Sequence, residues 1–181
     1  ELINIHRKLF SGIYNHAGVI RKYNFIKNEW ILNGDTVIYS SYETIMPALE
    51  YDFNQEKNFS YKELSIEESI KHLCRFTSNI WQIHPFGEGN TRTTAVFIIK
   101  YLRTFGFEIN DDTFAENSFY FRNSLVRANY KNIKKNIFED ISFLEKFFYN
   151  LLLDTHFDLK NRYTHIDYNQ SAKTENIKFR N

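Results

Sequence analysis

The sequence is poor in the residues that cross-link or interrupt a chain. Its 181 residues contain one cysteine, two prolines and six glycines. One cysteine excludes a disulfide within this stretch, and the scarcity of proline and glycine favours long helices. The cysteine, Cys74, falls on the apolar stripe of an expected helix, which indicates a buried thiol rather than a nucleophile or a metal ligand.

The sequence also lacks an excess of either charge and any long apolar run. Its 23 basic and 22 acidic residues leave a net charge of +1, a weak electrostatic footprint for a nucleic-acid-binding protein. A small basic group at Lys131, Lys134 and Lys135 is interpreted as a solvated helix face. No stretch approaches the ~18 apolar residues of a membrane span, and no signal segment opens the sequence. We therefore expect a cytoplasmic protein that binds neither membranes nor nucleic acid directly.

What is present is enough apolar and aromatic sequence, 43% and 18%, for one core, so we expect a single domain over residues 1–181. Segments 28–32 and 35–39 flank Asn33-Gly34, a dipeptide typical of the type I′ turn, which predicts a β-hairpin. Ser65 and Glu68 form a capping-box pattern at the start of a long amphipathic helix. The expected helices are 41–49 (which contains Pro47), 66–84, 90–105, 113–129, 137–151 and 170–179. The fold class is therefore all-α with one hairpin.

Chemistry-bearing residues gather in one loop, residues 84–92, which read HPFGEGNTR between two expected helices. Backbone N–H groups near the start of the second helix favour an anion there. Arg92 can clamp a phosphate, and Glu88 supplies the hard oxygen that Mg²⁺ prefers. His84 is suited to act as a base near neutral pH. These parts together are typical of phosphoryl or nucleotidyl transfer.

The loop resembles the active-site motif of the Fic family, H-x-F-x-D/E-G-N-G/K-R-x-x-R. The positions that match are His84, Phe86, Glu88, Gly89, Asn90 and Arg92. The preceding helix, the following helix and the upstream hairpin also stand in family order, so the resemblance runs from about Trp30 onward.

The resemblance implies an enzyme that transfers AMP from ATP to a Ser, Thr or Tyr hydroxyl of a target protein. His84 would take the hydroxyl proton, Glu88 would hold Mg²⁺ between the α- and β-phosphates, and Phe86 would anchor the loop. The residues expected to bind the phosphates are Gly87, Gly89, Asn90, Thr91 and Arg92. Residues 29–40 would form a flap that pins the target by strand pairing. The flap residues expected to contact the target are Ile31, Leu32, Thr36, Val37 and Ile38.

Two positions depart from the family pattern. Thr91 replaces glycine or lysine, which is mild at a helix start, and Ala95 replaces the second arginine of the motif. In the family that arginine contacts the terminal phosphate of ATP, so its absence bears on how the nucleotide is oriented. The basic residues that can substitute for it are Arg103, Arg122 and Arg127.

Ala95 leaves other functions open. A Fic-type enzyme that uses another nucleotide, a phosphate or a phosphocholine donor, or that removes AMP, is one alternative. A non-catalytic helical binding module is another, and the intact His84, Glu88 and Asn90 argue against it. Small bacterial members of the family modify type II topoisomerase subunits among other targets, and some self-associate. The resemblance therefore offers such a target and a homo-oligomer as expectations.

A possible brake lies near the C-terminus, where residues 171–176 read SAKTEN and fit the family's inhibitory pattern S/T-x-x-x-E-G/N. Ser171 and Glu175 are one turn apart and share a face of the expected helix 170–179. The resemblance implies that Glu175, followed by Asn176, enters the phosphate site and blocks a productive pose of ATP. An ordinary solvated tail is the alternative.

Overall fold

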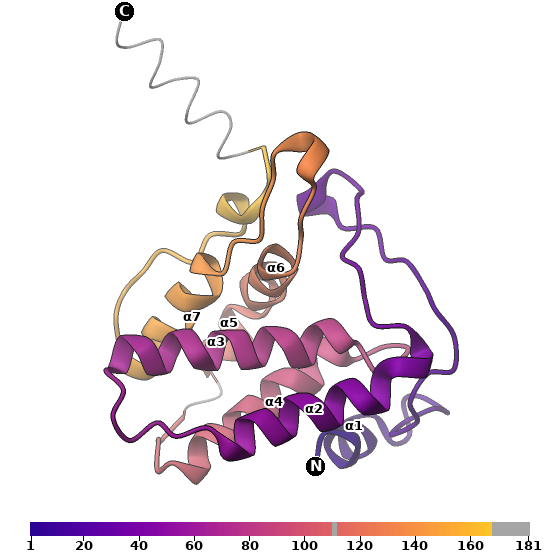
Figure 1. The fold of residues 1–181 in the computed structure, drawn as a ribbon, viewed down its shortest axis with the longest axis horizontal. Helices are drawn as coiled ribbons and strands as arrows, with labels where there is room; N and C mark the ends of the chain where they lie inside the picture. The colour runs from indigo at the N-terminus through magenta and orange to yellow at the C-terminus, as the bar shows by residue number, and fades with distance from the viewer. Residues whose placement is uncertain (110–111, 168–181) are drawn as a thin grey trace, which may run out of the picture.

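The computed structural model describes residues 1–109 and 112–167, and the regular secondary structure of this part of the chain is helical, joined by long loops (Figure 1). Its α-helices are α1 (Leu2–Phe10), α2 (Ile45–Asn58), α3 (Ile66–Ile83), α4 (Asn90–Thr104), α5 (Asp112–Glu116), α6 (Ser118–Ala128) and α7 (Ser142–Leu153). Short 3₁₀ turns are η1 (Trp30–Leu32), η2 (Tyr42–Thr44), η3 (Ile133–Lys135) and η4 (Asn161–Thr164). The all-α fold class is confirmed. The expected helix 170–179, with Ser171, Glu175 and Asn176, lies outside the described residues.

Helix α3 is the centre of the fold, and it packs against α2, α4, α6 and α7. Figure 1 shows it crossing the middle of the molecule. Its start is the capping box expected from the sequence: the Ser65 hydroxyl accepts from the Glu68 amide at 3.2 Å, and the Glu68 carboxylate accepts from the Ser65 amide at 2.9 Å. Because two free amides of the first turn are satisfied this way, α3 begins where the sequence predicts.

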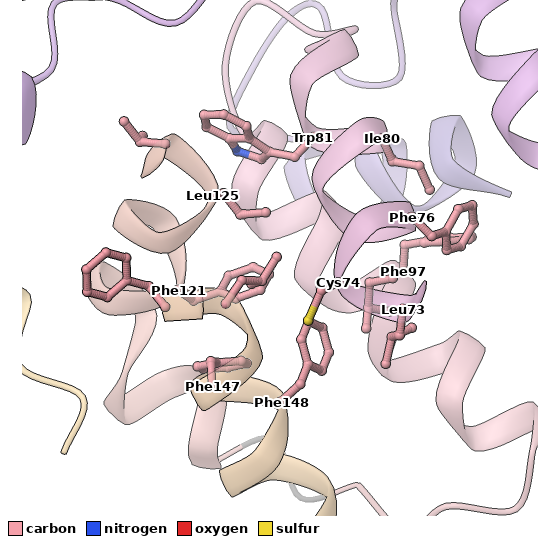
Figure 2. Packing of buried hydrophobic residues seen from close by; sticks show 14 of the residues in the cluster. Leu73, Cys74, Phe76, Ile80, Trp81, Phe97, Phe121, Leu125, Phe147 and Phe148 are labelled. Carbon is pink, nitrogen blue, oxygen red and sulfur yellow. The ribbon is translucent and has the colours of Figure 1, made fainter. Parts of the chain in front are cut away.

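The core around α3 is rich in aromatic side chains (Figure 2). Phe121 of α6 and Phe147 and Phe148 of α7 are fully buried beside it. Cys74 lies among them with no exposed surface, and burial raises the pKa of its thiol well above the ordinary value. The prediction of a buried, unreactive cysteine agrees with this environment.

Two helices differ from the sequence-based prediction, one because of a proline position and the other because of a side-chain hydrogen bond. Helix α2 continues to Asn58, because Pro47 lies in its first turn, where the missing amide has no partner to lose. The expected helix 113–129 is divided at Asn117, whose side chain donates to the Thr113 carbonyl at 3.1 Å and competes with the helical pattern.

The start of α7 also differs from the prediction. The helix begins at Ser142 rather than near 137, because Ile137 and Asn132 pair across a tight turn at 2.8 and 3.0 Å. The Asp140 carboxylate then accepts from the Ser142 amide at 3.0 Å and sets the new start. None of the helices in the described residues combines the length and apolar character that crossing a membrane requires.

The predicted hairpin is wrong in its strands but right in its turn. Asn33 and Gly34 both have positive φ, 56° and 84°, as the dipeptide predicts. The residues before them form the 3₁₀ turn η1, and no β-strand occurs in the described part of the chain. The reason is that consecutive Ile31 and Leu32 are both fully buried, whereas a strand would send them to opposite faces.

The flap, residues 29–40, is held against the rest of the fold at its tip. The Asp35 carboxylate accepts from the Tyr130 hydroxyl at 2.8 Å, and the Ile31 carbonyl accepts from the Ile166 amide at 3.0 Å. Ile31, Leu32 and Val37 are therefore core residues, which corrects their expected contact with a target. Ile38, at 81% exposure, and the half-buried Thr36 remain accessible.

Candidate active site

Two residues in left-handed conformation shape the loop between α3 and α4. His84 follows α3 with φ 51° and ψ 59°, and Gly89 precedes α4 with φ 80°. Gly89 has no side chain with which to cap the helix, so no side-chain acceptor satisfies the first amides of α4. These amides, together with the positive end of the helix dipole, favour an anion at this place.

Asn90 holds the loop in shape from within. Its side-chain oxygen accepts from the Phe86 amide at 2.9 Å, and its side-chain nitrogen donates to the Phe86 carbonyl at 2.8 Å. The side chain is only 4% exposed. Asn90 was expected to bind phosphate; in the structure its side chain braces the loop, and its backbone amide is the group left near the pocket.

Helix α1, which the sequence analysis did not predict, supports the loop from below. His6 is fully buried, stacks on the buried Phe86 at 3.8 Å between ring centroids, and contacts the Glu88 carbonyl at 3.0 Å. Its Nδ1 accepts from the Gly18 amide at 2.8 Å, so its Nε2 carries the hydrogen and donates to Glu88. Burial lowers the pKa of His6, which keeps it neutral in this role.

Phe10 of α1 reaches the same loop. A Cβ added to Gly89 would lie 2.4 Å from the Phe10 Cε2 atom, and the Arg92 guanidinium lies 5.0 Å above the same ring. The apolar spacing of Leu2, Ile5 and Phe10 is a helical signal that could have revealed α1. Nothing local in the sequence indicates that α1 would pack under the loop.

Arg21 joins the loop to the flap. It is 5% exposed, and its Nε donates to the His84 carbonyl at 2.8 Å. Its Nη2 donates to the Ser40 carbonyl of the flap at 2.5 Å and to the Ile83 carbonyl at 3.3 Å, and its backbone amide donates to the Pro85 carbonyl at 2.9 Å. A buried guanidinium thus satisfies carbonyls at the end of α3 that no helical partner can reach. Sequence reasoning missed Arg21, because no motif marks it.

His84 presents one free ring nitrogen. Its Nδ1 lies 3.2 Å from the Trp81 carbonyl, which can only accept, so Nδ1 carries the hydrogen and Nε2 keeps its lone pair. The side chain is 3% exposed, and the Tyr39 ring covers it at 4.1 Å between centroids. Burial lowers the pKa of His84 to about 3, so the imidazole is neutral at physiological pH and the lone pair of Nε2 is not protonated.

A pocket of about 160 Å³ opens beside this loop. Of the motif residues, His84, Glu88, Gly89, Asn90, Thr91 and Arg92 line it. Gly87 differs from its expected phosphate-binding place, because it faces Tyr23, whose hydroxyl would lie 2.7 Å from an added Cβ. The Thr91 hydroxyl is engaged by the Trp81 indole N–H at 2.9 Å, which joins the start of α4 to the end of α3.

The opposite wall contains residues that sequence reasoning did not place in the site: Lys27, Glu29 and Tyr39. Lys27 lies 3.7 Å from the Glu88 carboxylate, with both side chains well exposed. The Tyr39 hydroxyl is buried without a hydrogen-bond partner in the described part of the chain. Burial, with the nearby Glu29 carboxylate, raises the pKa of Tyr39. An unpartnered buried hydroxyl at a charged pocket is a group that a polar ligand can satisfy.

Of the three arginines that could replace the motif arginine missing at Ala95, the structure places one in the pocket. Arg122 lines the pocket, and its Nη2 donates to both Glu29 carboxylate oxygens at 2.6 and 2.8 Å. Arg103 binds the Ile109 carbonyl at 2.8 Å, and Arg127 binds the Thr164 carbonyl at 3.0 Å. Neither of these two lines the pocket, so Arg122 is the one positioned to meet a ligand there.

Mg²⁺ fits this site only as a shared ion. Within the described residues no group of three or more His, Cys, Asp or Glu side chains gathers as a metal cage. The Glu88 side chain is 59% exposed beside the phosphate-favouring amides. Mg²⁺ is commonly held by one or two carboxylates with substrate phosphates and water, and Glu88 suits that arrangement.

The arrangement is a helical domain with a His-bearing anion loop, and comparisons identify its class. The chain belongs to the Fic/DOC family, whose model matches residues 1–102. It is 28% identical over 150 residues to the protein adenylyltransferase VbhT of Bartonella schoenbuchensis, covering 76% of this chain and 30% of that protein. The chain thus spans about 30% of the length of this curated relative.

Solved structures agree on the fold. The N-terminal Fic domain of a Bep effector protein from Bartonella sp. AR 15-3 matches with a TM-score of 0.61 at 18% identity, over 83% of this chain and 68% of that one. The N-terminal Fic domain of Bep8 from Bartonella sp. 1-1C matches with a TM-score of 0.60 at 20% identity, over 83% and 71%. The family identification from the motif is confirmed.

Proposed function

We propose that this chain transfers AMP from ATP to a hydroxyl group of a target protein. The observation that carries the proposal is His84: its Nδ1–H is bound by the Trp81 carbonyl, and its Nε2 is free beside the start of α4. A base next to an anion-favouring helix start, with Arg92 on the first turn, suits phosphorus chemistry. The printed name of the relative VbhT, a protein adenylyltransferase, supports AMP as the transferred group.

In the proposed reaction, the Nε2 atom of His84 accepts the proton of the target hydroxyl. The hydroxyl oxygen forms a bond to the α-phosphorus of ATP, and the bond between that phosphorus and the β-phosphate oxygen breaks, which releases pyrophosphate. Arg92 and the first amides of α4 stabilise the phosphate charge. Glu88 would hold Mg²⁺, which when bound would offset the negative charge of the phosphate oxygens.

Few of the flap side chains that were expected to contact the target are accessible. Ile31, Leu32 and Val37 are buried, so Ile38 and Thr36 are the side chains that a target segment meets. The Tyr39 ring lies over His84, and it must shift before a target hydroxyl reaches Nε2. The target's identity, a type II topoisomerase subunit or another protein, stays a prediction.

The test is transfer of label from ATP into protein in a cell lysate. The enzyme carries Glu175→Gly, to remove the predicted brake, and ATP is labelled at either the α- or the γ-phosphate. Incorporation from the α-label alone supports AMP transfer. Incorporation from the γ-label identifies phosphate transfer, and no incorporation from either refutes the proposal in favour of another donor or a binding module.

The residue assignment is tested with His84→Asn in the same assay. Asparagine tolerates the positive φ of this position, so the loop keeps its shape while the base is lost. We expect a rate reduction of about 10²–10⁴-fold, as for removal of a general base. The exposed His156→Asn is the matched control and should keep full activity. Equal rates in both variants would remove His84 from the chemistry.

A further inference from the structure

Two ion pairs border the pocket, and they differ in burial. Lys27 and Glu88 are 3.7 Å apart and 37% and 59% exposed, so water screens their attraction. Glu29 is 1% exposed, and the Arg122 side chain that binds it is 25% exposed. The Glu29–Arg122 pair is therefore the better shielded from water, and its attraction is screened less.

Stability alone is a weak reason for such a pair. Desolvating a carboxylate and a guanidinium offsets most of their attraction, and apolar residues of similar volume often stabilise a fold as well. The pair also spans a long distance in the sequence, from the flap to α6, and meets at the pocket wall. A role in the pocket accounts for its place better than a role in packing.

The geometry leaves part of the guanidinium for a ligand. One nitrogen of Arg122, Nη2, donates to both oxygens of Glu29, and Nη1 makes a long contact of 3.4 Å with the Asn123 side-chain oxygen. A guanidinium has five N–H donors, so these contacts leave donors for a ligand. The same pocket contains Arg92, the first amides of α4 and the unpartnered Tyr39 hydroxyl. Guanidinium groups and helix-start amides on one cavity are the donor set that binds phosphate groups.

We propose that Arg122 is a phosphate-binding residue of the nucleotide site, and that Glu29 is its internal counter-ion, which sets the affinity for the nucleotide. The inference rests on the proposed use of a nucleotide by this pocket. In the free protein the Glu29 carboxylate neutralises Arg122. In the complex the phosphate oxygens share the guanidinium with Glu29, whose negative charge weakens the binding of the polyanion.

The test is ATP binding, measured by calorimetry at one fixed salt concentration with Mg²⁺. The Glu175→Gly protein, which lacks the predicted brake, is the reference, and the variants below are made in it. Arg122→Gln should weaken binding about 10- to 100-fold, the size expected for losing a hydrogen bond to a charged group. Glu29→Gln should strengthen it several-fold, because glutamine keeps an acceptor for Arg122 and removes a negative charge. Arg103→Gln, the same charge loss at a residue outside the pocket, is the matched control and should change binding less than about 2-fold.

The double variant Glu29→Gln with Arg122→Gln keeps the net charge and leaves no unpaired buried charge, so it separates binding from folding. It should melt cooperatively by circular dichroism and still bind ATP several-fold or more weakly than the Glu175→Gly reference, because the loss of Arg122 outweighs the gain from removing the Glu29 charge. If the Glu175→Gly protein binds ATP and the folded double variant in that background binds it equally well, Arg122 does not contact phosphate and this inference alone fails. If the Glu175→Gly protein binds no ATP in any of these titrations, the proposed function fails, and this inference fails with it.

Discussion

The substitution Gly89→Ala tests whether α1 and the loop are packed as tightly as the structure shows. Gly89 needs a positive φ of 80°, and an added Cβ would lie 2.4 Å from Cε2 and 2.5 Å from Cζ of Phe10. Gly106, just after the other end of α4, has a φ of 86° and nothing within 4 Å of an added Cβ. The two positions therefore share the backbone strain and differ in the clash.

The expected difference follows from these geometries. An alanine in the left-handed region costs roughly 1–2 kcal/mol at either position, and lower entropy of the unfolded chain returns about 0.4–1 kcal/mol. Overpacking against the buried Phe10 ring adds roughly 1–3 kcal/mol at Gly89 alone. For a chain of this size each kcal/mol lowers Tm by roughly 2–4 °C. Gly89→Ala should therefore melt on the order of 6 °C below Gly106→Ala.

The assay is thermal unfolding by circular dichroism, repeated in a Phe10→Leu background. Leucine lacks the two ring atoms that the new Cβ would meet, so the extra loss at Gly89 should largely disappear, and a double-mutant cycle measures this coupling. Equal melting temperatures for Gly89→Ala and Gly106→Ala in the wild-type background would refute the close packing of Phe10 on the loop.

Four further outcomes are expected. The free energy of unfolding should fall as the pH drops from about 6.5 toward 3. In that range the unfolded chain protonates His84, while the folded imidazole, with a pKa of about 3, stays neutral. Urea titrations at several pH values should show a smaller fall for His84→Asn. Asn90→Ala should lower the free energy of unfolding by roughly 2–4 kcal/mol in the same titrations, since it leaves the buried Phe86 amide and carbonyl unpaired. Ser65→Ala should cost about 1 kcal/mol, seen as a lower Tm, and no change would mean that the capping box adds nothing. Glu175→Gly should raise transfer activity over the wild type, and equal activity at every enzyme concentration would mean that residues 171–176 are an ordinary tail.

Elements with strong local signals were predictable from the sequence. The capping box at Ser65, the end of α3 near His84 and the end of α4 just before Gly106 all depend on residues within a few positions. The left-handed conformation of His84 was not predicted, because a following proline favours extended backbone. The hairpin failed for a different reason. The burial of both Ile31 and Leu32 is decided by distant residues that cover them, and no local pattern reports it.

The site divides in the same way. The motif residues are contiguous, so one loop brings them together. The sequence therefore predicted most of the pocket wall that this loop forms. The opposing wall depends on contacts across the fold: Arg122 meets Glu29, and Arg21 meets the His84 carbonyl. Spacing within a sequence cannot indicate such pairs, and the bracing role of Asn90 became visible only from its two bonds to Phe86.

The support that α1 gives the loop decides how small a working fragment of this protein can be. A fragment that starts after Gly18 would retain every residue of the motif. It would also expose the Phe86 ring that His6 covers, leave the Glu88 carbonyl without its donor, and remove the Phe10 ring from beneath Gly89. The motif is thus a signature of the family rather than a unit that folds by itself. Loss of ATP binding in such a short fragment would show that the support from α1 is missing, not that the motif residues lack a role.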